Sequence, residues 1–411
     1  MSMTSSMSPA CAQLIAAWDP RGGSTRGRSA QRAAAVVLAT VLFSWASTAG
    51  AAETSASSAS SQAGGSKATA TALPELLPGQ RTVMLADGSI LITGLPGGVL
   101  KATGAAIEDP TSGQVTPLPS GPAHPRAWHT ATVLPDGSVL LLGGIDASGN
   151  LVDTAERFDP SARSFEAVDH TGLITRVHQS ATLLTDGTVL IAGGVTARGA
   201  PVLDAELWNP RTGTSQPVSA QAASARLDAT ATLLTDGTVW IAGGTDAAGH
   251  ALGGGERYEP LVQRFVRQDN PPPELAQSAG PPQVSGTLPQ ADSHDIALDA
   301  QIAVRFNQAL KVDTINPNSI RLEGPGGAVD AAVVPAESGR LAFVTPSAPL
   351  QPSSTYTPLL FGAQDALGRL LAPLSFSFQT GTRFEFDSTQ ADNQASGSAT
   401  KQNRLFAQTS G

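Results

Sequence analysis

The feature that most constrains the fold is a segment of 19 residues that occurs three times at a spacing of 50 residues. It occupies residues 126–144 as RAWHTATVLPDGSVLLLGG, residues 176–194 as RVHQSATLLTDGTVLIAGG, and residues 226–244 as RLDATATLLTDGTVWIAGG. Residues 77–95, LPGQRTVMLADGSILITGL, form a weaker copy. Self-similarity at such a period indicates an array of similar supersecondary units.

Each unit contains four short segments that favour β-strands. Two apolar runs flank an Asp-Gly corner, and these two residues tolerate the positive φ that a tight hairpin needs. The second run is continuously apolar, which indicates an inner strand covered on both faces. Segments such as TAERFDP at 154–160 and SFEAV at 164–168 complete the unit. With 42 Gly, 30 Pro and 14% charged residues, the chain is expected to be all-β, and four strands per unit are typical of a β-propeller blade.

The unit resembles the kelch repeat, in which an apolar run leads into Gly-Gly and is followed by an acidic and then an aromatic residue. The Asp-Gly corner is similar to that of the galactose-oxidase-like branch of kelch propellers. The matching residues are Gly143, Gly144, Glu156 and Phe158; Gly193, Gly194, Glu206 and Trp208; and Gly243, Gly244, Glu256 and Tyr258. The resemblance implies a kelch-like β-propeller over residues 74–270, in which these glycine and glutamate residues have structural roles.

Only four units are recognisable, whereas kelch propellers usually have six or seven blades. The weaker copy also departs from the pattern, because it has Thr93-Gly94 in place of Gly-Gly. We expect a propeller of about four blades that closes into a ring. The alternative is an open arc that a partner or a second copy of the chain completes.

After a Pro-rich linker at 271–282, the pattern changes to short alternating strands over residues 283–381, which favour a β-sandwich. This region resembles the bacterial Ig-like domain of surface-layer and envelope proteins. The matching elements are IAVRFNQAL at 302–310, FVTPSAPLQPSSTY at 343–356 and DALGRLL at 365–371. The resemblance implies a spacer or stalk. Residues 382–411 are polar and are expected to form a flexible tail.

The first 51 residues have the composition of a signal peptide. Four Arg precede an apolar run at 33–51, and Ala49 and Ala51 are placed as an A-x-A cleavage site. An uncleaved membrane anchor is the alternative, because the run is just long enough to span a bilayer. Both alternatives predict export. Residues 52–73, rich in Ser and Ala, are expected to be a flexible spacer.

The charge and the cysteine content exclude several classes of function. The only cysteine, Cys11, lies in the predicted leader, so an exported mature chain has no disulfide, thiolate metal site or cysteine nucleophile. The formal charge of −9 becomes −12 without the leader, because the remaining chain has 21 Lys and Arg residues and 33 Asp and Glu residues. Such an acidic surface disfavours nucleic acid and anionic membranes as partners.

We expect neither a metal nor another cofactor. Copper-radical oxidation, which the galactose-oxidase resemblance suggests, needs tyrosine and histidine ligands and a tyrosine crosslinked to a cysteine. The chain has only Tyr258 and Tyr356, and Tyr258 occupies the repeated aromatic position of the blade core. The six histidines show no metal-ligand spacing, and no catalytic motif occurs in a fitting context. The sequence therefore predicts a protein that is not an enzyme.

One pair of charged positions repeats with the units. Arg126, Arg176 and Arg226 begin the three strong copies, and Glu156, Glu206 and Glu256 lie 30 residues after them. The weaker copy has Leu77 and Ala106 at the two positions, so both partners are lost together, unless a shift of two residues places Glu108 at the second position. This correlation predicts an Arg-Glu ion pair within each blade or between neighbours. Alternatively, the three arginines ring one mouth and bind an acidic peptide or a sugar acid.

The second and third residues after each repeated arginine vary between copies. They carry Trp128 and His129, His178 and Gln179, and Asp228 and Ala229. A scaffold that repeats its core but varies one rim position can specify a ligand there. Drift on an exposed loop is the alternative explanation. The candidate ligand-binding residues are Arg126, Arg176, Arg226, Trp128, His129, His178, Gln179 and Asp228.

The sequence thus predicts a secreted or envelope-attached protein with a propeller as binding head. The expected function is non-catalytic recognition of protein or carbohydrate at the cell surface. A second hypothesis is that the chain is the N-terminal portion of a larger surface or toxin-delivery polypeptide, and a third is a carbohydrate-active enzyme. Self-association is expected if the propeller is open.

Overall fold

A computed structural model describes residues 76–168, 172–222, 224–275 and 280–382 of the chain. The chain divides into two compact units, Met1–Ala72 and Leu73–Gly411, and all the described residues belong to the second. The predicted signal peptide, the spacer and all but the first residue of the predicted tail therefore lie outside the described residues. Within them the structure contains β-strands and short 3-10 turns but no α-helix, which confirms the all-β prediction.

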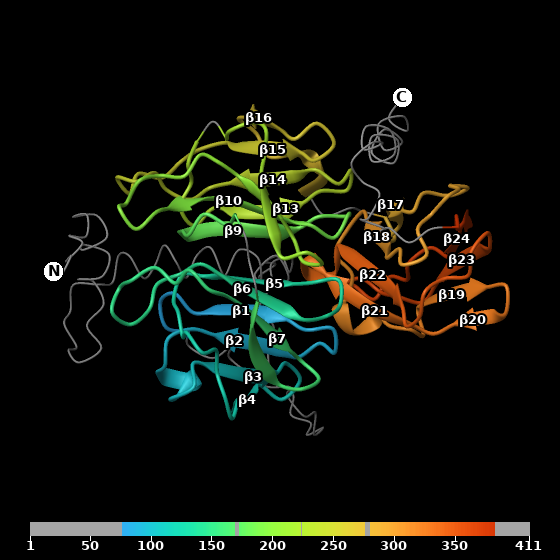
Figure 1. Cartoon of the computed structure of the whole chain (residues 1–411), viewed down its shortest axis with the longest axis horizontal. Coiled ribbons are helices and arrows are strands. Elements are labelled where there is room, and N and C mark those ends of the chain that lie inside the picture. Colours follow the sequence, from blue (N-terminus) through green and yellow to red (C-terminus); the bar gives the residue numbers. More distant parts are fainter. Residues whose placement is uncertain (1–75, 169–171, 223, 276–279, 383–411) are drawn as a thin grey trace, which may run out of the picture. The chain divides into compact units, whose positions relative to one another are not determined.

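Residues 81–268 form four antiparallel sheets of four strands, and each sheet is a meander of consecutive strands (Figure 1). Sheet 1 contains β1 (Arg81–Met84), β2 (Ile90–Thr93), β3 (Ala105–Asp109) and β4 (Gln114–Pro117). Sheet 2 contains β5 (Thr130–Val133), β6 (Val139–Leu142), β7 (Ala155–Asp159) and β8 (Ser164–Val168). Sheet 3 contains β9 (Val177–Leu183), β10 (Val189–Val195), β11 (Glu206–Asn209) and β12 (Thr214–Pro217). Sheet 4 contains β13 (Thr230–Leu233), β14 (Val239–Ala242), β15 (Gly255–Glu259) and β16 (Arg264–Gln268).

The Asp-Gly corners join the first and second strands of each sheet, as the sequence predicted. In sheet 2, Gly137 has a φ of 86° and the Asp136 carboxylate accepts a hydrogen bond of 3.0 Å from the backbone N–H of Ser138. Positive φ at glycine and a side chain that bonds the backbone two residues on are the features that make this dipeptide a turn. The other three corners repeat both features.

Neighbouring sheets contact one another through their first strands, in the pairs β1–β5, β5–β9 and β9–β13. The sequence had indicated the second strand as the inner one because it is continuously apolar. The second strands β6 and β10 are indeed buried along their whole length. A second strand in a stack of sheets is also covered on both faces, so continuous apolar sequence does not by itself identify the innermost strand.

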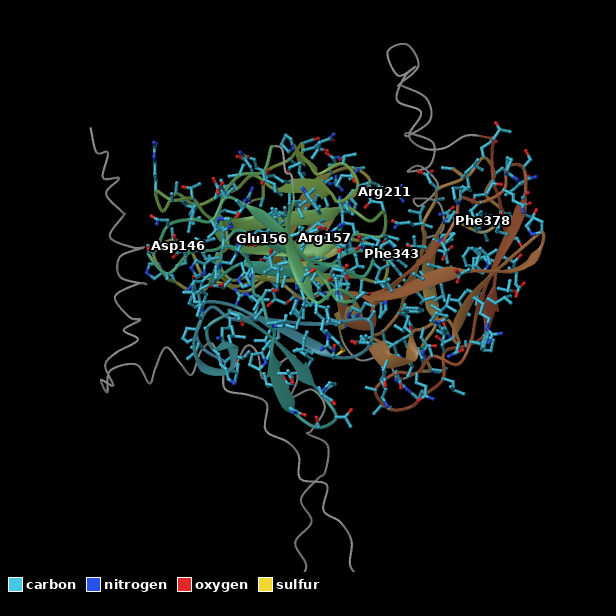
Figure 2. The ribbon with its side chains drawn as sticks, turned by 60° about the horizontal axis from the view of Figure 1, so that its bottom comes forward. Asp146, Glu156, Arg157, Arg211, Phe343 and Phe378 are labelled. Carbon is cyan, nitrogen blue, oxygen red and sulfur yellow. The ribbon has the colours of Figure 1, made fainter. Side chains whose placement is uncertain are left out.

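Buried Arg-Glu pairs lie within sheets 2 and 3. The Arg126 guanidinium donates to the Glu156 carboxylate, and Arg176 donates to Glu206 in the same way. Each arginine precedes the first strand of its sheet and each glutamate lies on the third strand, so the pair fixes where the chain enters the sheet. Figure 2 labels Glu156 and the next residue, Arg157, on the same strand. Glu156 is buried, whereas the Arg157 side chain is exposed and pairs with the exposed Glu166.

Backbone carbonyls complete the surroundings of each buried arginine. Arg176 donates to the carbonyl oxygens of Gly193, at 3.2 Å, and Asp204, at 2.9 Å. In sheet 4 the Arg226 Nε lies 3.9 Å from Glu256, and Arg226 donates to the carbonyl of Gly243 at 2.8 Å. The first glycine of each repeated Gly-Gly therefore supplies a carbonyl oxygen that accepts a hydrogen bond from the arginine of its own sheet.

Sheet 1 lacks this pair, and its outer face is covered differently. Leu77 and Ala106 occupy the Arg and Glu positions, and the fully buried Leu100 of a short turn packs on Ile92 and Ala106. At the inner strand the same face is open, since Met84 is 41% exposed whereas its counterpart Val133 is 6% exposed. Sheet 1 thus covers part of its outer face with its own residues, as expected of the first sheet in the series.

Sheet 4 forms the other end of the series. At Gly193 of sheet 3, an added Cβ would lie 2.3 Å from the Arg226 carbonyl oxygen of the next sheet, whereas at Gly243 no atom lies within 4 Å of such a Cβ. The Trp240 indole packs against Gly255, at positions where sheet 2 has Leu140 and Ala155. The four sheets therefore form a series with two different ends.

Residues 284–379 form the predicted β-sandwich. One sheet has the order β17-β18-β22-β21, and the other has the order β20-β19-β23-β24, with β25 also pairing with β23. The strands are β17 (Val284–Leu288), β18 (Ile302–Phe306), β19 (Ile320–Gly324), β20 (Gly327–Val329), β21 (Ala331–Ala336), β22 (Leu341–Pro346), β23 (Thr355–Leu360), β24 (Leu374–Ser375) and β25 (Phe378–Gln379). Their inward side chains, Phe306, Tyr356 and Phe378 among them, form one apolar core.

The sandwich contacts the repeat sheets through a shared apolar cluster and several polar groups. Phe343 and Val334 belong to the same buried cluster as Leu184 of sheet 3. The backbone N–H of Leu183 donates to the half-buried Glu337 carboxylate at 2.7 Å. Burial raises the pKa of Glu337 to about 7, although this hydrogen bond and the charge of Arg340 oppose the rise.

Removing one partner of a buried pair should be far more damaging than removing an exposed one. We expect Arg176→Met to lower the free energy of unfolding by about 3–5 kcal/mol, because it leaves the Glu206 carboxylate buried without its cation. The matched control Arg157→Met removes exposed ion pairs and should cost at most about 1 kcal/mol. Urea unfolding measures both, and equal losses would contradict the buried role.

The junction at Glu337 should make stability depend on pH. A raised carboxyl pKa means that the folded state holds the proton more tightly, so this contribution to stability should be lost as the pH rises from about 4.5 to about 7. Glu337→Gln keeps an oxygen acceptor for Leu183 but does not titrate. The melting temperature of wild type relative to this variant should therefore fall across that range, and an unchanged difference would contradict the assignment. Glu166→Gln, at an exposed site, is the control.

Candidate functional site

The residue two positions after each repeated arginine has an unusual backbone conformation. Trp128, His178 and Asp228 have φ values of 61°, 62° and 52°, and Gly79, at the equivalent position of sheet 1, has a φ of 84°. Left-handed φ costs an L-residue about 1 kcal/mol or more, and tryptophan and histidine seldom adopt it. Glycine at position 79 shows that the fold needs no side chain at this place.

A ladder of backbone hydrogen bonds joins these four residues across the sheets. The N–H of Trp128 donates to the carbonyl of Gly79 at 2.9 Å, the N–H of His178 to that of Trp128 at 3.3 Å, and the N–H of Asp228 to that of His178 at 2.9 Å. The left-handed conformation aims each N–H at the preceding sheet. Side chains that are 50 residues apart in sequence are thereby brought together.

Four side chains, one from each sheet, meet at this ladder. The rings of Trp128 and His178 lie 4.8 Å apart between centroids, and His178 Nδ1 is 2.8 Å from Asp228 Oδ2. Arg81 Nη2 donates to Asp228 Oδ1 at 3.4 Å, and the Arg81 guanidinium lies 6.0 Å from the Trp128 ring centroid. Arg81, Trp128, His178 and Asp228 are called the ladder cluster below.

The Asp228 carboxylate is held in its charged form. Burial alone would raise its pKa, but the hydrogen bond and charge of His178, together with Arg81, lower the pKa below its ordinary value. Its side chain remains 44% exposed. The ladder cluster therefore presents an oriented carboxylate and an aromatic ring where solvent reaches them.

The other residues predicted for ligand binding lie elsewhere. His129 and Gln179 are buried and bind the preceding sheet: His129 Nε2 is 2.8 Å from Thr93 Oγ1, and Gln179 Nε2 donates to the Leu142 carbonyl at 2.9 Å. Burial also lowers the pKa of His129 well below its ordinary value, so it is neutral at physiological pH. Trp128 and His129, which the sequence grouped together, thus point to different surroundings.

The three repeated arginines are buried within their sheets, and the structure does not bring their guanidinium groups into the ladder cluster. Burial lowers the pKa of Arg176, which the charge of Glu206 partly offsets. The arginine that does belong to the ladder cluster is Arg81, which the sequence did not single out. The equivalent residues of the other sheets are Thr130, Ser180 and Thr230. This difference between otherwise similar copies is the feature of the sequence that could have identified Arg81.

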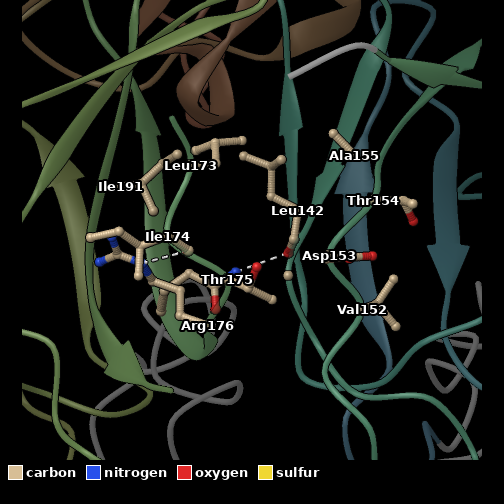
Figure 3. A pocket seen from close by; sticks show the side chains of 12 residues that line it. Leu142, Val152, Asp153, Thr154, Ala155, Leu173, Ile174, Thr175, Arg176 and Ile191 are labelled. Atoms are coloured by element: carbon tan, nitrogen blue, oxygen red, sulfur yellow. Dashed lines mark hydrogen bonds between the residues drawn. The ribbon is translucent and has the colours of Figure 1, made fainter. Parts of the chain in front are cut away.

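A small cavity lies between sheets 2 and 3, lined by Leu142, Ile174, Ile191 and the segment 152–155 (Figure 3). Arg176 closes one side and donates to the Ile174 carbonyl at 3.2 Å. The cavity has a volume of about 20 Å³, enough for roughly one water molecule. It belongs to the packing of neighbouring sheets and is separate from the ladder cluster.

The tyrosines do not fit a shared copper ion. Tyr258 lies in the core of the repeat sheets against Phe265, and Tyr356 lies in the separate core of the sandwich. Across residues 76–382, leaving aside the gaps in the description, no group of three or more His, Cys, Asp and Glu side chains is close enough to hold a metal ion. In the same residues no helix is long and apolar enough to cross a membrane.

Comparisons with known proteins identify one part of the chain. Residues 278–380 match the family model of the bacterial Ig-like domain. No curated protein matches the chain in sequence. The sequence resemblance seen for this region is thereby confirmed, and residues 278–380 are a bacterial Ig-like domain.

Several solved structures are similar to the chain. A fungal alcohol oxidase of the AA5 family in complex with copper is 14% identical, with a TM-score of 0.35 over 74% of this chain and 85% of that one. The protein YjhT is 11% identical, with a TM-score of 0.42 over 71% and 98%. The N-terminal part of the bacterial S-layer protein SbsC is 23% identical, with a TM-score of 0.21 over 25% and 24%.

The left-handed backbone at the ladder can be tested by comparing two substitutions at one site. His178→Gly and His178→Ala remove the same imidazole, but only glycine adopts positive φ without strain. We expect the glycine variant to be more stable by about 1 kcal/mol in urea unfolding. At Ser180, a strand position of the same sheet, the order should reverse by about 0.5–1 kcal/mol. The same order at both sites would contradict the assignment.

Proposed function

We propose that the chain is an exported recognition protein in which a kelch-like propeller of four blades binds protein or carbohydrate at the cell surface and the Ig-like domain serves as a stalk. The four repeat sheets are the blades. The differing ends of sheets 1 and 4 favour an open arc over a closed ring, because neither end repeats the packing seen between the inner sheets.

The strained residues of the ladder cluster carry this proposal. Trp128, His178 and Asp228 adopt a conformation in which glycine would be more stable, as at Gly79. Strain of this kind is typical of functional sites, where the side chain has a role that offsets its cost. A tryptophan ring beside ionised and hydrogen-bonding groups also suits recognition, since aromatic and charged side chains dominate binding sites.

The cell-surface location rests on two further observations. The Ig-like family is bacterial and residues 278–380 match it. The leader composition, with arginines before an apolar run and an A-x-A site, predicts export. Both agree with the acidic composition of the chain and with the position of its one cysteine in the leader.

A triple glycine variant tests the proposed function. Trp128→Gly, His178→Gly and Asp228→Gly together should reduce binding to isolated bacterial cell envelopes at least about tenfold while the variant stays folded, because relief of the backbone strain partly offsets the packing that Trp128 loses. Arg157→Met is the matched surface control. Envelopes treated with protease or with periodate distinguish a protein ligand from a glycan. Unchanged binding by the triple variant would refute the role of the ladder cluster.

A further inference from the structure

Within the ladder cluster, the Arg81 guanidinium is held only loosely by Asp228 and by the Trp128 ring. Its 3.4 Å distance to Asp228 Oδ1 is longer than the roughly 2.7–2.9 Å of a strong charge-assisted hydrogen bond. Its guanidinium lies 6.0 Å from the Trp128 ring centroid, at the outer limit of a cation–π contact. The Arg81 side chain is 31% exposed, whereas Arg126 in its buried pair is fully enclosed.

The groups around this guanidinium are held in place without it. Asp228 is anchored through its other oxygen by His178 at 2.8 Å, and its backbone N–H is fixed by the ladder. Trp128 is held at left-handed φ and packs on the His178 ring. The carbonyl of His129 accepts from Arg81 Nε at 2.9 Å. An ionised carboxylate, an aromatic face and a carbonyl oxygen therefore form a preorganised slot for a planar cation.

Arg81 is not needed to build its sheet. The equivalent residues Thr130, Ser180 and Thr230 serve in the other three sheets with no long cationic side chain. Arg81 also lies on the end strand β1, and its own side chain is partly exposed to solvent, so it has room to leave the slot. A residue that the scaffold does not require and that fills a preformed slot resembles a bound ligand.

We propose that the slot formed by Trp128, Asp228 and the His129 carbonyl binds an arginine side chain of a partner protein, and that Arg81 occupies the slot until the partner displaces it. The planar guanidinium, with several donors and an affinity for aromatic faces, matches this set better than the compact ammonium of lysine. The formal charge of −9 attracts a basic partner over a longer range. This inference rests on the proposed role of the ladder cluster in recognition and names the chemical class of its ligand.

Emptying the slot in the full chain provides the test. N-acetyl-arginine amide is the probe, and calorimetric titration measures its affinity for wild type and for Arg81→Ala. Because an occupied slot weakens apparent affinity in proportion to the fraction that is free, the variant should bind the probe about tenfold more tightly than wild type. Arg81→Ala/Asp228→Asn should lose this gain. N-acetyl-norleucine amide, which lacks the charge, should bind neither variant measurably.

The melting temperature gives a second, independent measure of probe binding. The melting temperature of Arg81→Ala should rise on addition of the arginine probe more than that of wild type, and Arg81→Met, which keeps the apolar stem, serves if the alanine variant does not fold. A folded Arg81 variant that binds the arginine probe no better than wild type overturns the inference. Equal binding of Nα-acetyl-lysine amide, a compact cation of the same charge, would overturn it as well. The proposed function is tested by a different result: it is contradicted if the triple glycine variant still binds cell envelopes.

Discussion

The buried arginine at the start of each strong repeat is the interaction on which the rest of the sheets depends. It joins three parts of its unit that are far apart in sequence: the approach to the first strand, the Gly-Gly at the end of the second, and the glutamate of the third. A buried guanidinium is tolerated only when its donors are satisfied, so its partners must hold their places. This requirement explains why the arginine, the glycines and the glutamate recur together while nearby residues vary.

The residues that follow each arginine also share one backbone conformation. Two positions on, the backbone turns to left-handed φ and donates its N–H to the preceding sheet, which places Trp128, His178 and Asp228 in one group. One position further, His129 and Gln179 are buried and form hydrogen bonds with that same preceding sheet. The second residue after the arginine is therefore a candidate recognition residue and the third is structural, and the scaffold can vary one set without disturbing the other.

The two ends of the repeat series differ for a physical reason. An inner sheet is covered on both faces by its neighbours, whereas an end sheet must cover one face itself. Sheet 1 does so with Leu100, and sheet 4 does so with Trp240 packed on Gly255. The loss of the Arg-Glu pair in the weaker copy belongs to the same adaptation, since Ala106, at the position of the glutamate, packs there with Leu100 and Ile92.

The sequence alone determined the repeat and the hairpins at the Asp-Gly corners, because both recur at a fixed spacing, and it determined the sandwich through its short alternating strands. It also predicted an Arg-Glu ion pair, and the structure placed that pair within sheets 2 and 3. The sequence pointed to Trp128, His178 and Asp228 through their variation. Only the tertiary structure separated them from His129 and Gln179, since the direction of adjacent side chains depends on a left-handed backbone that the sequence does not announce. Arg81 likewise joined the cluster only in three dimensions, because its partner Asp228 is 147 residues away and comes from the opposite end of the series.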